Sequence, residues 1–548
     1  MAFDGFITKA VIVELNREIL NAKIDKINQP DRNTILLGVY SNGKNYMLEL
    51  CIHPENCRIH LSFHTRQNPL VAPNFCMLLR KHLLGSKIIS IESFDLDRTV
   101  YINFESYDEF GEKTTKKLIV EIMGRYSNII LIDSDNIILD SLKHVNSSRN
   151  LLPKNIYIPP KNSKVSLLDI DNFNEFYNVL SSYNFSLDKA FIGFSKTFAN
   201  FIVHKLDVDF SNIETITSLY NYLNEILKFK CIECVNVDSG DYVLDLANVT
   251  NYLCVNTFID DFYFEKENKE QFVHLRNTLL KMILTVLKKY EKRLENINSK
   301  LKETENMDIY RLYGELIISN LYKLPNNVSY ITVENYYDEN KLISIPLDKS
   351  ISPHKNADRY FKKYAKLKNT IDIVSIQKLE TEQELDYIES IIFSLENSKT
   401  LEDLNDIYLE LSVSSLFQDY FKKKKKNEKV KTSKNSPKEF NIDGFTVLVG
   451  KNNRQNDILT IKTARPYDIW FHAQKIHGSH VILKLEPNQK VDNSVLQKCA
   501  ILAAQYSKAK SSTNVPIDYT YVKYVKKPAG SKPGMVIYTH QKTLFVTP

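Results

Sequence analysis

The segment that sets the architecture of this chain is LKMILTVLKKYEKRLENINSKL, residues 280–301. Leucines recur every seven residues from Leu280 to Leu301, and Ile283, Tyr290 and Ile297 follow three residues after the first three of them. This spacing is the a/d pattern of a coiled-coil helix. A second segment repeats the 3-4-3 spacing in two sets of apolar residues: Leu385, Ile388, Ile392 and Leu395, then Leu401, Leu404, Tyr408 and Leu411.

The region between the two segments favours an arm that folds back on itself. Residues 322–353 contain prolines and a strand-like stretch, Tyr330–Val333, which interrupt the helical pattern. Because the two apolar seams have similar length, we expect an intramolecular antiparallel hairpin, about 42 Å long for four heptads. A coiled-coil homodimer is the alternative that the spacing leaves open.

The remaining chain predicts a multidomain α+β protein. Thr34–Tyr40 and Asn45–Cys51 flank Ser41-Asn42-Gly43 as a β-hairpin, and Phe75–Leu84 has helical spacing. Short strand-like stretches follow at Ile88–Phe94, Val100–Phe104, Leu118–Ile122 and Ile129–Asp133, and in the C-terminal part at Thr446–Val449, Ile458–Lys462, Tyr519–Val525 and Met535–Tyr538. Ile192–Ser195 breaks a helical region, either as a simple connection between helices or as a helix–hairpin–helix, whose backbone N–H groups can bind phosphate.

We expect five parts along the 548 residues. They are an N-terminal α+β domain at 1–166, a helix–hairpin–helix domain at 167–230, a return segment completing the N-terminal lobe at 231–270, the arm at 271–430 with a middle domain at about 322–365, and a basic hinge with a C-terminal α+β domain at 431–548.

Charge is distributed unevenly, and this indicates a polyanionic partner. The net charge is +6, yet residues 422–548 carry 24 Lys and Arg against 8 Asp and Glu, which leaves −10 for residues 1–421. A basic end on an acidic body is typical of nucleic-acid binding. A solubilising tail would be low in complexity, and only 422–437 has that composition.

Several classes of protein are disfavoured. No apolar run reaches the length of a membrane span, and the N-terminus lacks a signal-peptide pattern, so we expect a cytoplasmic protein with no membrane association. Nucleotide, zinc-protease and serine-hydrolase motifs are missing. Cys231-x-x-Cys234 is isolated, and His472, His477 and His480 have no obvious fourth ligand, so we predict no metal and no cofactor.

Two regions carry residue types suited to RNA. Asp97-Arg98 lies in a loop where Arg suits a phosphate and Asp a base or sugar donor, although a local ion pair is the simpler interpretation. Residues 121–128, EIMGRYSN, break a strand at a Gly and present stacking and hydrogen-bonding side chains, as a polar β-turn also would. Further candidates for RNA binding are Lys422, Lys423, Lys424, Lys425, Lys426, His472, His480, Lys526, Lys527 and Lys532.

The chain resembles the NFACT family throughout its length. The stretches that carry the resemblance are MAFDGF (1–6), HTRQNP (64–69), FCMLLRKHL (75–83), EIMGRYSN (121–128), GEL and NLY (314–316, 320–322), NA and YFKKY (356–357, 360–364), DIWFH and GSH (468–472, 478–480), and residues 527–538. The resemblance implies a glycosylase-like N-terminal domain, a helix–hairpin–helix, a long antiparallel coiled-coil arm with a middle domain at its tip, and a C-terminal RNA-binding domain.

The resemblance also implies a function. Family members of this kind act in ribosome quality control, where they bind a stalled 50S subunit carrying peptidyl-tRNA and recruit alanyl-tRNA for mRNA-independent alanine tailing. The expected partners are 23S rRNA, the stalk base, tRNA-Ala, and an S4-type companion similar to heat-shock protein 15. The ribosome forms the peptide bond, so this chain is not expected to be an enzyme. The tRNA-binding residues implied by the family motifs are Asp97, Arg98, Glu121, Ile122, Met123 and Arg125.

Two alternatives remain at this point. Family members are also described as fibronectin-binding adhesins, but the sequence has no signal peptide, wall-sorting tail or repeat array. The N-terminal domain is similar to DNA glycosylases that use an N-terminal Pro as nucleophile, whereas this chain has Ala2 and Phe3.

Overall fold

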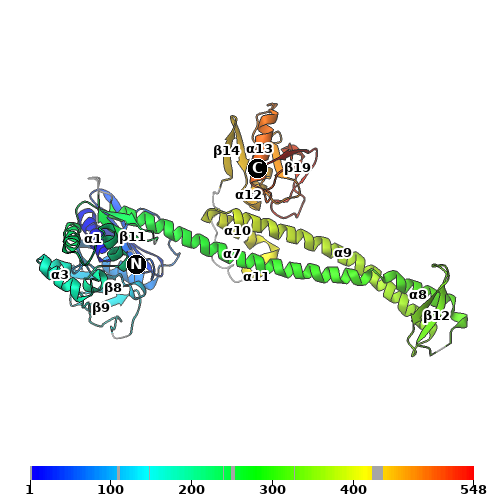
Figure 1. The fold of residues 1–548 in the computed structure, drawn as a ribbon, viewed down its shortest axis with the longest axis horizontal. Coiled ribbons are helices and arrows are strands. Elements are labelled where there is room, and N and C mark those ends of the chain that lie inside the picture. The colour runs from blue at the N-terminus through cyan, green and yellow to red at the C-terminus, as the bar shows by residue number, and fades with distance from the viewer. Residues whose placement is uncertain are drawn as a thin grey trace. The chain divides into compact units, whose positions relative to one another are not determined.

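The computed structural model describes residues 3–107, 111–146, 149–238, 240–247, 254–325, 327–421 and 436–548, which form two compact units (Figure 1). Unit 1 is Met1–Glu267 and unit 2 is Asn268–Pro548. The chain is a mixed α and β multidomain protein, as the sequence indicates. The finer boundaries expected at residues 166, 230 and 430 stay predictions.

Unit 1 is built on one antiparallel sheet, with nine strands in the described residues. The strand order is β4-β3-β2-β1-β5-β6-β7-β8-β9. The strands are β1 (Lys23–Asp31), β2 (Thr34–Ser41), β3 (Lys44–Cys51), β4 (Arg58–Ser62), β5 (Lys87–Glu92), β6 (Thr99–Tyr107), β7 (Lys113–Glu121), β8 (Asn128–Ile132) and β9 (Ile138–Ser141). The predicted hairpin is confirmed as β2–β3, and its turn residues Asn42 and Gly43 have φ angles of 48° and 78°. This left-handed geometry matches the twist of the paired strands.

Helices of unit 1 share one large apolar core: the first two pack on this sheet, and the next four pack on one another and on a short hairpin. They are α1 (Gly5–Ile19), α2 (Asn74–Leu83), α3 (Phe173–Ser182), α4 (Leu187–Ala190), α5 (Lys196–Lys205) and α6 (Ile213–Ile226), with short 3-10 turns at Gly124–Tyr126 and Leu167–Asp169. A hairpin of β10 (Ile232–Asn236) and β11 (Tyr242–Leu246) precedes the first turns of α7 (Val255–Thr304). The helix predicted at Phe75–Leu84 corresponds to α2, and the predicted break at Ile192–Ser195 separates α4 from α5.

Three segments of unit 1 meet at Gly5. The backbone N–H of Gly5 donates to the carbonyl oxygen of Gly193 at 3.0 Å. A Cβ atom at Gly5 would lie 1.8 Å from the carbonyl oxygen of Leu96 and 2.5 Å from the Cα of Gly193. Only glycine therefore permits this approach of the α1 N-terminus to the loop before β6 and to the turn between α4 and α5.

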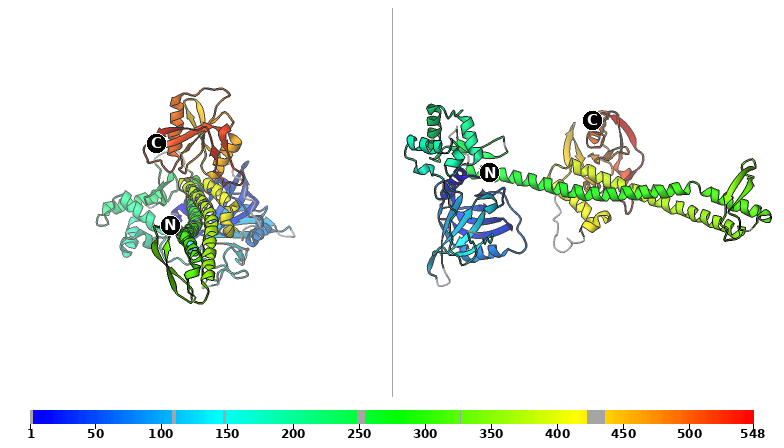
Figure 2. Two further views of the ribbon diagram at one scale, coloured as in Figure 1. Left: turned by 90° about the vertical axis from the view of Figure 1, so that its right-hand side faces the viewer. Right: turned by 60° about the horizontal axis from the view of Figure 1, so that its bottom comes forward.

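Unit 2 contains an antiparallel pair of long helices formed within one chain. The part of α7 from Asn268 onward runs outward, and α9 (Pro353–Asn397) returns beside it (Figures 1 and 2). Between them lie α8 (Met307–Ser319), a 3-10 turn at Leu321–Lys323, and a hairpin of β12 (Tyr330–Asn335) and β13 (Lys341–Pro346). The predicted Tyr330–Val333 strand is thus the first half of a hairpin. Apolar residues of α7 and α9 share one core, which favours the intramolecular arrangement over the homodimer.

The apolar seam of α7 is wider than the heptad pattern predicts. Leu279, Met282, Ile283 and Val286 are buried, whereas Leu280 and Leu287 are only partly buried. The reason is a third helix, α10 (Leu401–Val413), which joins the same core and is followed by a 3-10 turn (Ser415–Phe417) and α11 (Gln418–Phe421). A helix with two neighbours buries a broader stripe than a two-stranded coiled coil.

The C-terminal part of unit 2 is a second α+β domain, residues 438–548. Its antiparallel sheet has the order β14-β15-β17-β16-β18-β21 in the described residues. The elements are β14 (Lys438–Ile442), β15 (Phe445–Val449), α12 (Asn453–Asp457), β16 (Ile469–Ala473), β17 (Val481–Leu483), α13 (Asn493–Gln505), β18 (Val515–Tyr521), a 3-10 turn (Val522–Tyr524), β19 (Val525–Lys526), β20 (Ile537–Tyr538) and β21 (Lys542–Val546). Helix α13 covers one face of the sheet, and Leu459, Trp470 and Ile482 lie in the core on the other.

The strand predicted at Ile458–Lys462 is wrong. Residues Ile458–Thr463 form a π-helix that continues directly from α12. Its burial does not alternate as a strand's would, because Leu459 and Thr460 are both buried while Ile458 and Ile461 are 42% and 48% exposed. The apolar spacing at this point was therefore insufficient to separate a strand from a short helix.

The contact at Gly5 yields a stability prediction. We expect Gly5→Ala to lower the unfolding free energy of unit 1 by about 3 kcal/mol or more, since the new methyl group overlaps backbone atoms that have no room to move. Denaturant unfolding of the full chain measures this. Gly38→Ala is the matched control, because its Cβ would meet the movable carboxylate of Asp25 at 2.8 Å. Equal stability of the two variants would contradict the prediction.

Candidate functional site

A pocket of about 230 Å³ in unit 1 joins two regions that are far apart in the sequence. Its lining includes Asp97 and Arg98 from the loop before β6, and Gly193 and Ser195 from the turn between α4 and α5. Asp4 lies at its base, and three cationic side chains contribute to its wall: Arg98, Lys164 and Lys196. The predicted Asp-Arg pair and the predicted hairpin turn therefore belong to one site.

The loop that carries Asp97 and Arg98 is continuous with the segment at residues 121–128. Asp97 accepts a hydrogen bond from the backbone N–H of Arg98 through Oδ1 at 2.7 Å, and both side chains are half-buried. The backbone N–H of Ile122 donates to the carbonyl oxygen of Arg98 at 2.9 Å, just beyond the β6–β7 pairing of Thr99 with Glu121. All six residues implied as tRNA-binding thus lie together.

These six residues differ in accessibility. Glu121 and Ile122 are fully buried, whereas Met123 is half-buried and Arg125 is exposed on the 3-10 turn Gly124–Tyr126. Tyr126, which was not among the six, is 77% exposed. Only the Met123–Tyr126 part of the segment can touch a ligand directly in this conformation.

Glu121 is held by a buried polar cluster. Its Oε1 accepts from Arg149 Nη2 at 2.5 Å and from the hydroxyl group of Tyr157 at 2.9 Å. Burial and the adjacent carboxylate raise the pKa of Tyr157 above its ordinary value. The Glu121 carboxylate therefore positions the turn that follows it. Sequence reasoning missed Arg149 and Tyr157, because nothing near them in the sequence signals a partner across the sheet.

Asp4 occupies the N-terminus of α5. Its Oδ2 accepts from the Ser195 hydroxyl group at 2.9 Å and from the Ser195 backbone N–H at 3.4 Å, while its Oδ1 caps α1 through the Ile7 N–H at 3.1 Å. Burial raises the pKa of Asp4 to about 6, against the lowering effect of these hydrogen bonds and of Arg98. A carboxylate thus occupies the turn at which a helix–hairpin–helix would offer its N–H groups to a phosphate.

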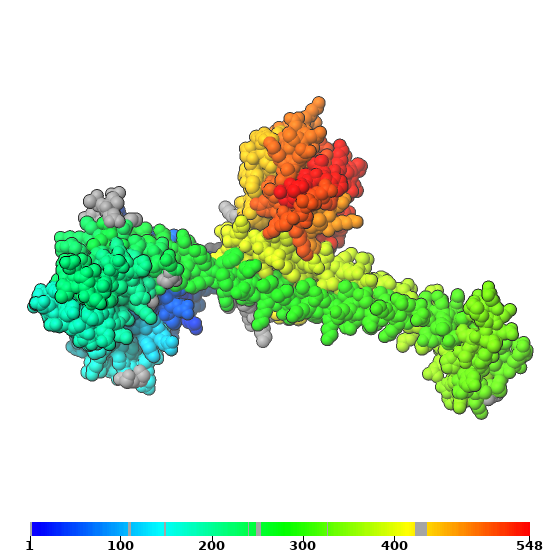
Figure 3. Space-filling view, in the orientation of Figure 1, coloured from blue at the N-terminus to red at the C-terminus, as the bar shows by residue number. Residues whose placement is uncertain are grey.

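A second site lies in unit 2, where the C-terminal domain rests on α9 and α10 (Figure 3). Three buried carboxylates of α10 face a polar segment of the domain, residues 451–455. Asp403 pairs with Lys451 at 3.5 Å, Asp406 accepts from Gln455 Nε2 at 3.2 Å, and Glu410 accepts from Asn453 Nδ2 at 3.1 Å. Each carboxylate of this stripe has its own donor, which fixes the register of the domain on the helix.

Ion pairs surround this contact. Glu384 of α9 pairs with Lys532 at 3.1 Å, and Glu389 pairs with Lys508 at 3.4 Å. His477 approaches Asp386 at 3.5 Å. The acidic body and the basic end inferred from composition therefore meet within unit 2, and part of the cationic surface of the domain is already paired.

The other predicted RNA-binding residues are distributed around this domain. His472 and His480 line a pocket of about 400 Å³ at the contact with α9. Lys527 forms an ion pair with Asp457, and Lys526 is exposed on β19. Residues Lys422–Lys426 lie outside the described residues.

The described residues lack two further features. Within the described ranges, no group of three or more His, Cys, Asp or Glu side chains is arranged to hold a metal ion. None of the helices in the same ranges combines the length and apolar character that a membrane crossing requires.

Comparisons with known proteins were informative along the whole chain. The family model described as NFACT N-terminal and middle domains matches residues 4–434, and the one described as NFACT protein RNA binding domain matches residues 438–539. The Rqc2 homolog RqcH of Bacillus subtilis is 36% identical over 566 residues, covering 100% of this chain and 98% of that protein. The human ribosome quality control complex subunit NEMF is 27% identical over 135 residues, covering 25% of this chain and 12% of that protein.

Solved structures of similar sequence each cover about half of the chain. The N-terminal part of the fibronectin/fibrinogen-binding protein from Streptococcus suis is 28% identical, covers 48% of this chain and 99% of that chain, and has a TM-score of 0.41. At that TM-score the likeness supports no conclusion about fold or binding.

The Glu121 cluster predicts a structural role for Arg149. We expect Arg149→Met to lower the unfolding free energy of unit 1 by about 3 kcal/mol, because it leaves a buried carboxylate without its cation. Denaturant unfolding provides the measurement, and Arg125→Met, at an exposed position in the following 3-10 turn, is the control. Adding Glu121→Gln should restore much of the loss. A change no larger than that of the control would show that the ion pair does not hold the turn.

Glu410 predicts a pH-dependent stability of unit 2. Burial raises the pKa of Glu410 from 4.5 to about 7, despite hydrogen bonds from Asn453 and Tyr387. Since the folded state holds this proton more tightly than the unfolded state, the stabilisation is complete below pH 4.5 and is lost as the pH rises through 7. Relative to Glu410→Gln, the wild type should lose about 3 kcal/mol between pH 4 and pH 8.

Thermal unfolding of both proteins across this pH range tests the prediction. Glu396→Gln, at an exposed position of α9, is the matched control and should follow the wild type. Parallel pH profiles for wild type and Glu410→Gln would disprove the assignment.

Proposed function

The chain belongs to the NFACT family, and from this premise we propose that it works in ribosome quality control, binding a stalled 50S subunit with its peptidyl-tRNA and recruiting alanyl-tRNA for alanine tailing. The name of the human relative supports the general role, and the full-length similarity to the Bacillus relative supports the same domain set. The choice of tRNA and the tailing reaction are parts of the proposal that rest on the family resemblance.

The observation that carries the proposal is that Asp97, Arg98 and the Met123–Tyr126 turn adjoin at the paired ends of β6 and β7, where the Ile122 N–H donates to the Arg98 carbonyl oxygen. An exposed Tyr126 and a 70% exposed Phe94 flank these residues and offer surfaces on which unpaired bases stack. The cations at the pocket suit a phosphate backbone. This combination fits recognition of a single-stranded or looped part of a tRNA better than a small-molecule site.

We propose a binding and positioning role rather than catalysis of the peptide bond. Holding an aminoacyl-tRNA next to the peptidyl-tRNA removes translational and rotational entropy from the reaction, and this entropy is a large share of a bimolecular barrier. In this proposal the ribosome supplies the reacting centre. The chain would contribute Arg98 and Arg125 as phosphate contacts and the buried Glu121–Arg149 pair as their support.

Finer parts of the architecture also belong to the proposal. We assign a glycosylase-like fold to the N-terminal domain and a helix–hairpin–helix to α3–α6, without glycosylase activity, because Ala2 stands where those enzymes carry their Pro nucleophile. No structural observation favours the adhesin alternative.

The tip of the arm is the proposed contact with the stalk base and 23S rRNA. Tyr322 and Tyr330 are 79% and 64% exposed there, and Lys363 lies 4.0 Å from the ring centre of Tyr310. Aromatic and cationic side chains in this mixture suit an RNA surface. The Lys422–Lys426 run would add non-specific attraction to rRNA, and the S4-type companion would bind the same particle.

The tRNA site is tested with a double variant. We expect Asp97→Ala with Arg98→Ala to reduce co-purifying tRNA-Ala by tenfold or more, about 1.4 kcal/mol, while 50S binding persists through the arm and the C-terminal domain. Sequencing of bound tRNA and sucrose-gradient sedimentation measure the two quantities.

The chain supplies a matched control for this variant. Asp31-Arg32 is another adjacent Asp-Arg pair, exposed at the turn between β1 and β2 and outside the pocket. Asp31→Ala with Arg32→Ala should leave tRNA recovery unchanged. If both double variants retained wild-type amounts of tRNA-Ala, the site would have to lie elsewhere.

A further inference from the structure

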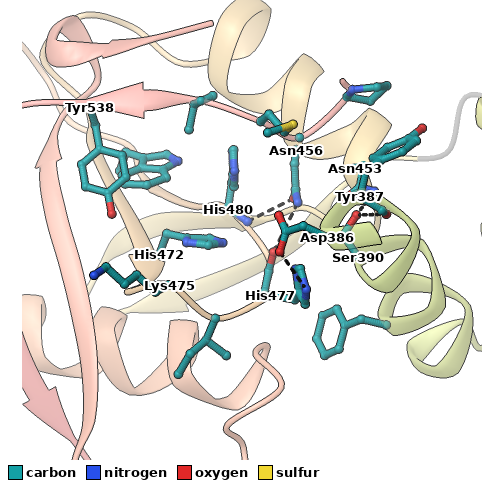
Figure 4. Close-up of a pocket in the computed structure, with 18 residues that line it drawn as sticks. Asp386, Tyr387, Ser390, Asn453, Asn456, His472, Lys475, His477, His480 and Tyr538 are labelled. Carbon is teal, nitrogen blue, oxygen red and sulfur yellow. Dashed lines mark hydrogen bonds and ion pairs between the residues drawn. The ribbon is translucent and has the colours of Figure 1, made fainter. Parts of the chain in front are cut away.

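The pocket of about 400 Å³ in unit 2 has walls from two different parts of the chain. Asp386, Tyr387 and Ser390 of α9 form one wall. The C-terminal domain forms the other with side chains from β16, from the loop before β17 and from residues 533–538 (Figure 4). We call this space the seam pocket. It is separate from the pocket at Asp97 in unit 1.

Flat rings dominate the domain side of the seam pocket. The rings of Trp470 and Tyr538 lie 4.7 Å apart, and the His472 ring is stacked near Trp470 at 5.6 Å with an interplanar angle of 15°. His480 stands almost perpendicular to His472, at 5.4 Å and 85°. Figure 4 shows His472 and His480 directed into the space that faces α9. Such an arrangement offers both a face and an edge to a planar aromatic guest.

The polar groups in the interior of the seam pocket are uncharged. Burial lowers the pKa of His472 to about 4 and that of His480 well below its ordinary value, so both rings are neutral at physiological pH. A neutral imidazole carries one donor and one acceptor. Trp470 is fully buried, and its Nε1 has no hydrogen-bond partner among the described residues. His480 already bonds the Thr460 hydroxyl group through Nδ1 at 2.7 Å, and His472 interacts with the backbone of Gly478, so the unpartnered polar group of these described side chains is the Trp470 N–H. An uncharged interior of this kind suits a nucleobase better than a phosphate.

Charged groups are confined to the mouth. Lys475 is exposed there with a φ angle of 54°, opposite Asp386, which is engaged by His477 at 3.5 Å. Lys532 also lies near the rim, paired with Glu384. An uncharged aromatic interior below a cationic rim is the distribution expected for a base with its adjoining phosphate outside.

We propose that the seam pocket binds one unstacked base of a single-stranded RNA, with the neighbouring phosphate at Lys475. A volume of about 400 Å³ is sufficient for a nucleoside-sized group. The family model for the C-terminal part is that of an RNA-binding domain, which supplies the class of ligand but no position for it. The proposal goes beyond tRNA recruitment at Asp97 and does not depend on it.

The two-walled geometry has a consequence for binding. A base held between His472 and α9 touches both the domain and the arm, so it stabilises their contact. RNA binding here should therefore strengthen the docked arrangement instead of displacing the domain from α9.

The single Trp of the chain gives a direct test. Titration of the full-length protein with the four ribonucleoside monophosphates and with a single-stranded RNA hexamer should produce a saturable change in Trp470 emission. His472→Ala should weaken the response to the hexamer about tenfold by removing one stacking partner. Lys475→Glu, at an exposed position, should weaken the hexamer response by a similar factor and lower its salt dependence. Lys542→Glu is the charge-matched control outside the pocket and should retain wild-type binding.

Several results would overturn the proposal. One is an unchanged Trp470 emission when anisotropy shows that the hexamer binds, and another is an equal emission response to inorganic phosphate alone. A third is an equal loss of hexamer binding in the Lys475→Glu and Lys542→Glu variants. The last is a response to an acidic peptide in the absence of any response to nucleotides. If His472→Ala fails to fold, the Lys475 and Lys542 pair decides the question. Because Asp97→Ala with Arg98→Ala leaves the seam pocket intact, its nucleotide response should equal that of the wild type, which separates this proposal from the tRNA assignment.

Discussion

The approach of backbone to backbone at Gly5 is the constraint on which unit 1 depends. The first residue of α1 touches the loop before β6 and the turn between α4 and α5 at distances that exclude any Cβ atom. Asp4 adds hydrogen bonds to both helix N-termini at the same point. Without this contact, Arg98 and the hairpin turn would belong to separate surfaces, and no common pocket would exist. A backbone constraint, and not a side-chain cluster, therefore brings the cationic groups together.

Local patterns predicted local structure well in this chain. The heptads marked α7 and the end of α9, and Asn42-Gly43 marked the β2–β3 turn, because helix period and turn geometry are properties of neighbouring residues. The partners of Glu121 could not be predicted, since Arg149 and Tyr157 reach it only through the folded sheet. The wider seam of α7 has the same origin, because the position of α10 is set by tertiary packing. Ile458–Thr463 shows the limit of short apolar runs.

Electrostatic asymmetry has a structural explanation in unit 2. The composition indicated that the basic C-terminal domain binds an external polyanion. In the structure, however, α9 and α10 of the same chain present carboxylates to this domain. Asp406 and Glu410 accept hydrogen bonds from amide groups, whereas Asp403 pairs with Lys451. The pairing leaves other cations of the domain, such as Lys526, exposed for partners outside the chain. The net charge of each region therefore predicted that the C-terminal domain is basic. It did not predict that part of this basic surface pairs with carboxylates of the same chain.

The C-terminal domain is covalently connected to α11. This connection affects the competition between α10 and external ligands for the domain. Only residues 422–437 separate α11 from β14 in the sequence, so the acidic stripe of α10 experiences the domain at an effective concentration in the millimolar range. A free polyanion that binds the same face of the C-terminal domain must compete with this high local concentration of α10. Its apparent affinity for the domain is therefore lower than its intrinsic affinity. The tether therefore favours competing polyanions that carry many phosphates over short or sparse anions.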